Sequence, residues 1–248
     1  MKKLILLVLL CTGLLRAQDP APAPIHLTFQ TIGFDITKDD IFIKQAKGFV
    51  RLVIETNSIS AKTYDYVGPA VMSVYRKAKT ADKISYEPVG QVTFPPIDAT
   101  QTGRFILVFS GGSGGTMRIT SVADDMTAFP LQSVRVINAL TGQVGVMVNK
   151  DAELLTPGQI RLFSVRGAKD NRVEIHIAVK HRNKWIQANN NVITCDPDSR
   201  STIFLVNNSA PDAPAHEPPA IRFLTLHDRP KDKPTAQAPE EIETPPQT

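Results

Sequence analysis

Short segments rich in Ile, Val, Phe, Tyr and Thr recur along most of this chain, and turn-forming residues separate them. Strands of a sandwich or barrel recur at this kind of spacing, about 8 to 12 residues, because each strand crosses a layer and then reverses at a turn. No stretch of a dozen residues holds the period of an amphipathic helix. The sequence therefore predicts an all-β fold, with strands at residues 25–34, 41–45, 49–56, 70–76, 89–94, 104–110, 116–122, 133–138, 144–149, 159–165, 172–180, 184–188 and 201–207.

Two of these segments predict how deeply their strands are buried. Residues 173–179 alternate, with Val and Ile at the odd positions and Glu174, His176 and Ala178 between them. This period of two is typical of a strand with one face in the core and one in water. Residues 104–109 instead form a nearly continuous apolar run, which indicates a strand covered on both faces.

Turn chemistry supports this interpretation. Thr156-Pro157-Gly158-Gln159 has proline and glycine at the two central positions of a type II turn. Residues 77–84 are charged, and we expect a solvated loop there, with a helical turn as the alternative.

The length suits two Ig-like β-sandwiches of about 100 residues each, or one large sandwich. We predict two, at residues 25–124 and 125–229, after a Pro/Ala leader at 18–24. The second includes a returning strand near 221–226, because a lone apolar strand is not stable in a polar segment. Residues 230–248 contain too little apolar surface to fold and are predicted to form a disordered tail.

A faint internal repeat accompanies this division. Residues 49–54 (FVRLVI) resemble residues 133–137 (SVRVI), and each segment is followed by a polar loop and another apolar strand. The repeat indicates either two related sandwiches or two unrelated strands built from common strand residues.

The first 17 residues predict a cleaved signal peptide. Lys2 and Lys3 precede an apolar run that extends to about Leu15, which is too short to span a bilayer, and Ala17 offers a small residue before the cut. An uncleaved anchor is the alternative. We therefore expect an exported protein, periplasmic or secreted, with no transmembrane span after cleavage.

Cleavage of these residues would change the net charge and the cysteine count of the protein. It removes three cations and no acidic residue, so the formal charge falls from +4 to +1 and does not favour a nucleic-acid partner. It also leaves Cys195 as a single thiol, without a partner for an internal disulfide. We interpret Cys195 as an inert residue at a strand end, because nothing nearby in sequence would lower its pKa.

No catalytic, cofactor or metal site is predicted. Residues 111–115 match the G-x-S-x-G pattern of a serine hydrolase, with Ser113 as nucleophile and Asp124 or Asp125 and a downstream histidine as its partners. A strand is expected to follow, however, where that fold needs a helix. The five histidines have no metal-binding spacing, and Asp124-Asp125 and Asp196-Pro197-Asp198 lack the further ligands of a calcium loop. Asx turns explain these aspartates more simply.

One cluster could bind a ligand. Lys180, His181, Arg182 and Lys184 lie at the expected tip of a hairpin, beside Trp185, the only tryptophan of the chain. Charge attraction and stacking would suit an anionic glycan or a phosphate-bearing surface, whereas a solvated hairpin tip that discourages aggregation is the alternative.

Residues 129–163 (FPLQSVRVINALTGQVGVMVNKDAELLTPGQIRLF) carry a resemblance. A V-R-V-I-N strand, a short apolar strand and a P-G-Q turn resemble a pattern of uncharacterised exported bacterial Ig-like β-sandwich proteins. The segment is also similar to the periplasmic accessory protein of alginate O-acetylation. The resemblance implies a sandwich in the cell envelope without catalytic residues, although a fold does not determine a function.

Three functional hypotheses follow. The first is a non-enzymatic envelope or secreted protein that binds or scaffolds another envelope protein through strand edges and hairpin tips. The second is a carbohydrate-binding module that uses Trp185 and the basic 180–184 hairpin with Tyr64, Tyr66 or Tyr75. The third is a serine hydrolase that uses Ser113.

Overall fold

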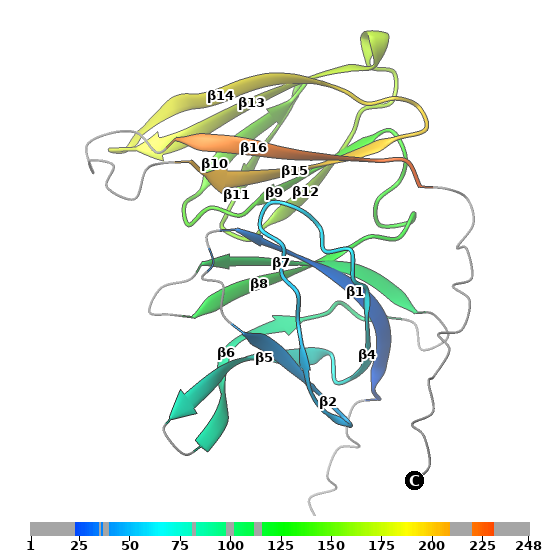
Figure 1. Cartoon of the computed structure of the whole chain (residues 1–248). Coiled ribbons are helices and arrows are strands. Elements are labelled where there is room, and N and C mark those ends of the chain that lie inside the picture. The colour runs from blue at the N-terminus through cyan, green and yellow to red at the C-terminus, as the bar shows by residue number, and fades with distance from the viewer. Residues whose placement is uncertain are drawn as a thin grey trace, which may run out of the picture.

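The computed structural model describes residues 23–34, 36, 40–80, 83–97, 102–111, 116–208 and 220–230, without the side chains of residues 79, 80 and 83. Within these ranges the chain forms sixteen strands and a single short 3-10 helix, Lys169–Asn171. The predicted all-β class is confirmed, and the strands form four sheets stacked in two sandwiches (Figure 1). The predicted signal peptide, most of the leader and nearly all of the predicted tail lie outside the described residues.

The first sandwich consists of two four-stranded sheets. Its inner sheet has the order β4-β1-β7-β8, formed by Tyr64–Gly68, Ile25–Phe34, Gly103–Gly111 and Met117–Ala123. Its outer sheet has the order β3-β2-β5-β6, formed by Gly48–Arg51, Ile41–Gln45, Val71–Thr80 and Lys83–Thr93. Leu27, Phe29 and Leu107 belong to the apolar core between the two sheets.

The second sandwich repeats this arrangement. Its inner sheet has the order β12-β9-β15-β16, formed by Ile160–Ser164, Ser133–Asn138, Arg200–Asn207 and Ile221–Asp228. Its outer sheet has the order β11-β10-β13-β14, formed by Asp151–Leu155, Val144–Val148, Arg172–His181 and Lys184–Thr194. Each strand of the second sandwich thus occupies the place of the strand eight positions earlier in the chain.

The strands that are equivalent by topology are not the strands that resemble each other in sequence. By topology, β9 is the equivalent of β1, and β3 is the equivalent of β11. The similarity of residues 49–54 to residues 133–137 therefore pairs strands that hold different places. It reflects residue types that are common in strands, while the architecture itself is repeated.

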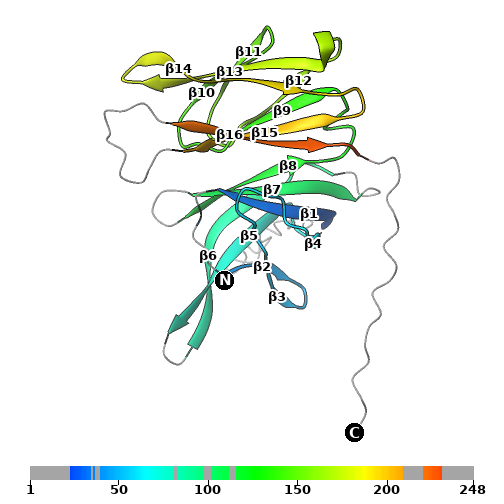
Figure 2. The ribbon, with the colours of Figure 1, turned by 45° about the horizontal axis from the view of Figure 1, so that its top comes forward.

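The two inner sheets face each other and form a third apolar core between the sandwiches (Figure 2). We call this layer the seam. The first sandwich contributes Ile32, Phe34, Ile106, Val108 and Val122, and the second contributes Ile137, Phe204 and Val206. The rings of Phe34 and Phe204 lie 5.1 Å apart. The seam explains why residues 104–109 are apolar on both faces, because β7 packs on the first core with one face and on the seam with the other.

The strand prediction was wrong in two respects. It missed β4 and β11, whose short segments YDYVG and DAELL carry acidic residues that do not look like strand sequence. It also placed a loop at residues 77–84, where β5 and β6 instead continue as a hairpin beyond the part of β5 that pairs with β2. We call this projecting hairpin, described at residues 77–80 and 83–86, the arm (Figure 2). Pairing between its own strands stabilises the arm where composition alone favours a loop.

Residues 124–132 link β8 of the first sandwich to β9 of the second, and contacts of Asp125 and Phe129 hold this linker in place. The Asp125 carboxylate accepts hydrogen bonds from the backbone N–H groups of Thr127 and Ala128, which forms the expected Asx turn. Phe129 is buried, and its ring centroid lies 3.9 Å from the guanidinium of Arg135 and 4.5 Å from that of Arg200.

The buried carboxylate of Asp124 pairs with both of these cations. Asp124 Oδ1 lies 3.3 Å from Arg135 Nη2 and 3.5 Å from Arg200 Nη2. Arg200 also contacts Asp228 at 2.6 Å, and its Nη1 donates to the Phe129 carbonyl at 2.6 Å. Desolvation lowers the pKa of Arg135 to about 10, although the charge of Asp124 acts in the opposite direction, so Arg135 stays protonated at neutral pH.

We predict that Asp124→Asn lowers the free energy of unfolding by about 3 kcal/mol, because it leaves the buried Arg135 without its ion-pair partner and Arg200 with Asp228 alone. Asp40→Asn is the matched control: its pair with Arg51, at 2.6 Å, is exposed, so we expect a loss below about 1 kcal/mol. Urea denaturation of both variants measures the difference, and equal losses would contradict a structural role for Asp124.

Candidate functional site

The predicted basic cluster lies on the hairpin that joins β13 to β14. His181 pairs with Lys184, and Arg182 and Asn183 form the two-residue turn with φ of 48° and 63°. Two successive positive φ values define a type I′ turn, whose twist matches that of the flanking strands. Arginine seldom adopts positive φ, so the backbone of Arg182 is in an unfavourable conformation at this turn. The hairpin brings all five predicted residues, the four basic ones and Trp185, into one short segment.

The cations of this tip are exposed and are not neutralised by neighbours. Lys180, Arg182 and Lys184 are exposed, and no ion pair among the described residues involves them. By contrast, Arg161 and Arg229 in the same sandwich are paired with Glu153 and Asp196. The hairpin tip therefore presents free positive charge to a ligand.

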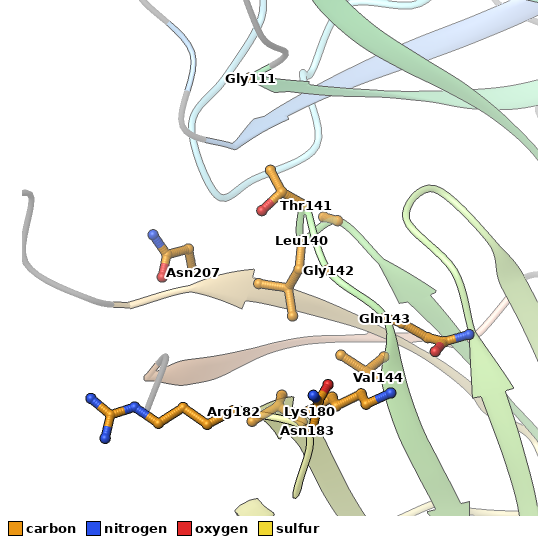
Figure 3. Close-up of a pocket in the computed structure, with 12 residues that line it drawn as sticks. Gly111, Leu140, Thr141, Gly142, Gln143, Val144, Lys180, Arg182, Asn183 and Asn207 are labelled. Carbon is orange, nitrogen blue, oxygen red and sulfur yellow. The ribbon is translucent and has the colours of Figure 1, made fainter. Parts of the chain in front are cut away.

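A cavity of about 910 Å³ borders the tip. Figure 3 shows Lys180, Arg182 and Asn183 at one side of it and Gly111 of the first sandwich at the other, with the loop of residues 139–143 between them. The buried Asn138 shapes this loop, because its amide donates to the carbonyls of Gly142 at 2.8 Å and Leu155 at 3.0 Å. Its side-chain oxygen accepts from the N–H of Leu140 at 3.0 Å.

The first sandwich helps to hold the cavity. Arg118, on β8, donates to the Leu140 carbonyl at 3.0 Å. The cavity thus combines backbone groups of a fixed loop with cationic side chains, a combination that suits a polar or anionic group. Sequence patterns did not reveal this loop, because residues 139–143 (ALTGQ) carry no charge and match no binding motif.

Trp185 does not line the cavity. It pairs with Lys180 on the outer face of the sheet β11-β10-β13-β14, and 47% of its surface is exposed. The hairpin therefore offers two surfaces, the cavity at its tip and an aromatic face on its outer side.

The tyrosines proposed to act with Trp185 are elsewhere. Tyr64 and Tyr66 are buried in the first sandwich, where the Tyr64 hydroxyl accepts from Val53 N–H and the Tyr66 hydroxyl donates to Pro69. Burial explains the error, because a sequence does not show which face of a short strand such as β4 turns inward. Tyr75 lies in the outer sheet of the first sandwich, next to Phe42 in register and with its ring 5.2 Å from that of Phe49. The two outer sheets form the opposite ends of the four-layer stack, so Tyr75 and Trp185 do not share a site (Figure 1).

The candidate nucleophiles within the described residues are shielded from solvent. Cys195 is buried, and desolvation raises the pKa of its thiol, so it stays protonated at neutral pH. Ser201 Oγ lies 2.9 Å from His227 Nδ1, but Ser201 is fully buried. A Ser–His contact of this kind without access for a substrate serves the packing of β15 on β16.

The residues proposed for hydrolysis are not assembled as expected. Ser113 lies outside the described residues. Asp124 is engaged by arginines at the linker, and Asp125 caps a turn, so both aspartates have structural partners.

The remaining acidic pair also has a partner, because Asp196 and Asp198 both contact Arg229. Among the described residues, no group of three or more His, Cys, Asp or Glu side chains could hold a metal ion. No helix in the described part of the chain is long and apolar enough to cross a membrane.

Comparisons with known proteins do not assign this chain to a family. No protein-family model matches the chain, and no curated protein matches it. Among solved structures, the chain is similar to a two-domain structure of Extended-Synaptotagmin 2, with 12% identity and a TM-score of 0.24. The match covers 90% of this chain and 97% of that chain. A likeness of this size says nothing about a shared site or ligand.

The burial of Cys195 predicts slow thiol chemistry. We expect the native protein to react with Ellman's reagent at least about 100-fold more slowly than the urea-unfolded protein, because both burial and a raised pKa reduce the exposed thiolate. Absorbance at fixed reagent concentration follows both reactions. Rapid stoichiometric labelling of the folded protein would show that the thiol is accessible.

Proposed function

We propose that this chain is an exported, non-enzymatic protein of the cell envelope that binds and scaffolds other envelope components. The observation that carries the proposal is the seam, which locks two sandwiches into one body. Phe34, Phe204 and the other seam residues are buried as completely as the residues of either core. A body of this kind holds its two outer sheets at fixed positions facing away from each other, as a scaffold requires.

Two projecting hairpins supply contact surfaces at opposite ends of this body. The arm extends from the outer sheet of the first sandwich and carries Ile84, which is 53% exposed. The basic hairpin extends from the outer sheet of the second sandwich. Exposed hairpins and strand edges accept partners by strand addition or by surface contact, without catalytic residues.

The proposed export is supported by the sequence of residues 1–17 and leads to a direct test. We expect the protein recovered from its native cells to begin at Gln18, as read by N-terminal sequencing. Leu7→Arg should block processing, because a charge interrupts the apolar run, whereas Leu7→Ile should not. An intact N-terminus on the wild-type protein would contradict cleavage and favour the uncleaved anchor.

The scaffold proposal predicts a protein partner that depends on the arm. Crosslinking of a C-terminally tagged chain in intact cells, followed by mass spectrometry, should recover one or two envelope proteins at near-stoichiometric yield. A variant that joins Lys77 to Tyr86 through Asn-Gly keeps a hairpin turn and removes the exposed Ile84. We expect it to lose at least about tenfold in recovery.

Val67→Ala is the control for this comparison, since Val67 is exposed on β4, away from the arm. It should recover the same proteins as the wild type. If no protein is enriched above an unrelated exported sandwich, or if the arm variant recovers all partners equally, the arm-dependent scaffold is excluded.

A further inference from the structure

Two small residues, Gly145 and Ala178, lie side by side beneath Trp185 on the outer face of its sheet. The register places Leu154, Gly145, Ala178 and Gln187 side by side across β11, β10, β13 and β14. A Cβ atom added at Gly145 would lie 3.8 Å from Cζ3 of Trp185 and 3.7 Å from Cβ of Ala178. The indole ring therefore reaches Gly145 from two strands away.

The contact between Trp185 and Gly145 determines the orientation of the indole ring relative to the sheet. Neighbouring strands are about 4.8 Å apart, and β13 separates β14 from β10. Trp185 can contact Gly145 only if its ring lies across Ala178, nearly parallel to the sheet. One face of the ring then packs on small side chains and the other faces solvent, which accounts for an exposed fraction of 47%. A flat ring of this kind is a platform for stacking.

Hydrogen-bonding side chains lie beside the platform on the same face of the sheet. Gln187 lies in the same row, and His176 and Asn190 are paired in the adjacent row. The C–H face of a pyranose ring stacks on an aromatic ring, while its equatorial hydroxyl groups need amide or imidazole partners at the rim. The outer face supplies both groups in one plane, as a sugar ring requires.

The charge beside the platform selects the kind of sugar. Lys180 is directly opposite Trp185 in the ladder and is exposed. On β13, the nearest carboxylate that faces the same way is Glu174, six residues away, which corresponds to about 20 Å along a strand. Glu174 lies 4.0 Å from His176. The surroundings of the ring are therefore cationic.

We propose that this face binds an acidic polysaccharide, with a pyranose ring stacked on Trp185 and a uronate carboxylate held by Lys180. The inference rests on the proposed function as a binding protein and names one of its ligands. It uses Trp185 and Lys180 of the predicted cluster and replaces the buried Tyr64 and Tyr66 with Gln187, His176 and Asn190.

The fluorescence of Trp185 tests this directly, because the chain has no other tryptophan. The probes are a polygalacturonate hexasaccharide and the neutral cellohexaose, titrated into the full mature protein. We expect the acidic probe to change the emission saturably and to bind at least about tenfold more tightly than the neutral probe. Added salt should weaken the acidic probe only, because a charge contact is screened.

Calorimetry of variants completes the test. Trp185→Ala should abolish binding of the acidic probe, and Trp185→Phe should retain part of it. Lys180→Gln should lower affinity for the acidic probe about tenfold. Lys169→Gln is the matched control: Lys169 is exposed on the 3-10 helix that precedes the opposite end of β13 from Lys180, so the variant removes one positive charge away from the platform and we expect little change. Circular dichroism confirms that each variant is folded.

The contrary outcomes are distinct. Unchanged Trp185 emission with both probes, or full binding by Trp185→Ala, would overturn the glycan site while the crosslinking experiment still decides the scaffold proposal. Equal binding of both probes with no effect of Lys180→Gln would overturn the acidic ligand. Loss of a crosslinked protein from Trp185→Ala, without glycan binding, would assign the face to a protein contact instead.

Discussion

The arrangement of the two sandwiches depends on the ion pairs that two buried guanidinium groups form at the linker. Arg135 and Arg200 belong to the second sandwich, yet their partners Asp124 and Phe129 come from the end of the first sandwich and the linker. Buried charges are tolerated only when they are paired and hydrogen-bonded. This pairing forms only when the inner sheets are in place, so it specifies one arrangement of the sandwiches, whereas the apolar seam supplies most of the contact.

The two outer sheets occupy equivalent places in the repeated topology but present aromatic residues differently. In the first sandwich, Phe49 stacks on Tyr86 with centroids 3.8 Å apart, and Phe42 and Tyr75 contact the same pair. These rings cover one another and stabilise the base of the arm. In the second sandwich a single ring lies on glycine and alanine, and its free face is open to a ligand. This difference is why the proposed ligand site lies on the second sandwich.

The all-β class and most strands could be predicted because alternation and apolar runs record burial directly, as in residues 173–179 and 104–109. The short strands β4 and β11 could not, since pairing with neighbours fixes them while acidic residues interrupt their short apolar segments. For the site, sequence located the basic hairpin and Trp185 through composition. It could not reveal Gly145 and Ala178 beneath the ring, because they come together only through the register of strands distant in sequence.

The parallel pairing of β1 with β7 has a consequence for the time course of folding. Leu27 is in register with Gly103, so the first strand of the sandwich has no inner-sheet neighbour on that side until the chain has been made well past residue 103. Such distant contacts form late, because closing the intervening loop costs entropy before any contact repays it. The first sandwich of a nascent chain therefore closes only after most of its residues have been made, which would suit the proposed export, because an incompletely folded chain can be threaded through a membrane pore.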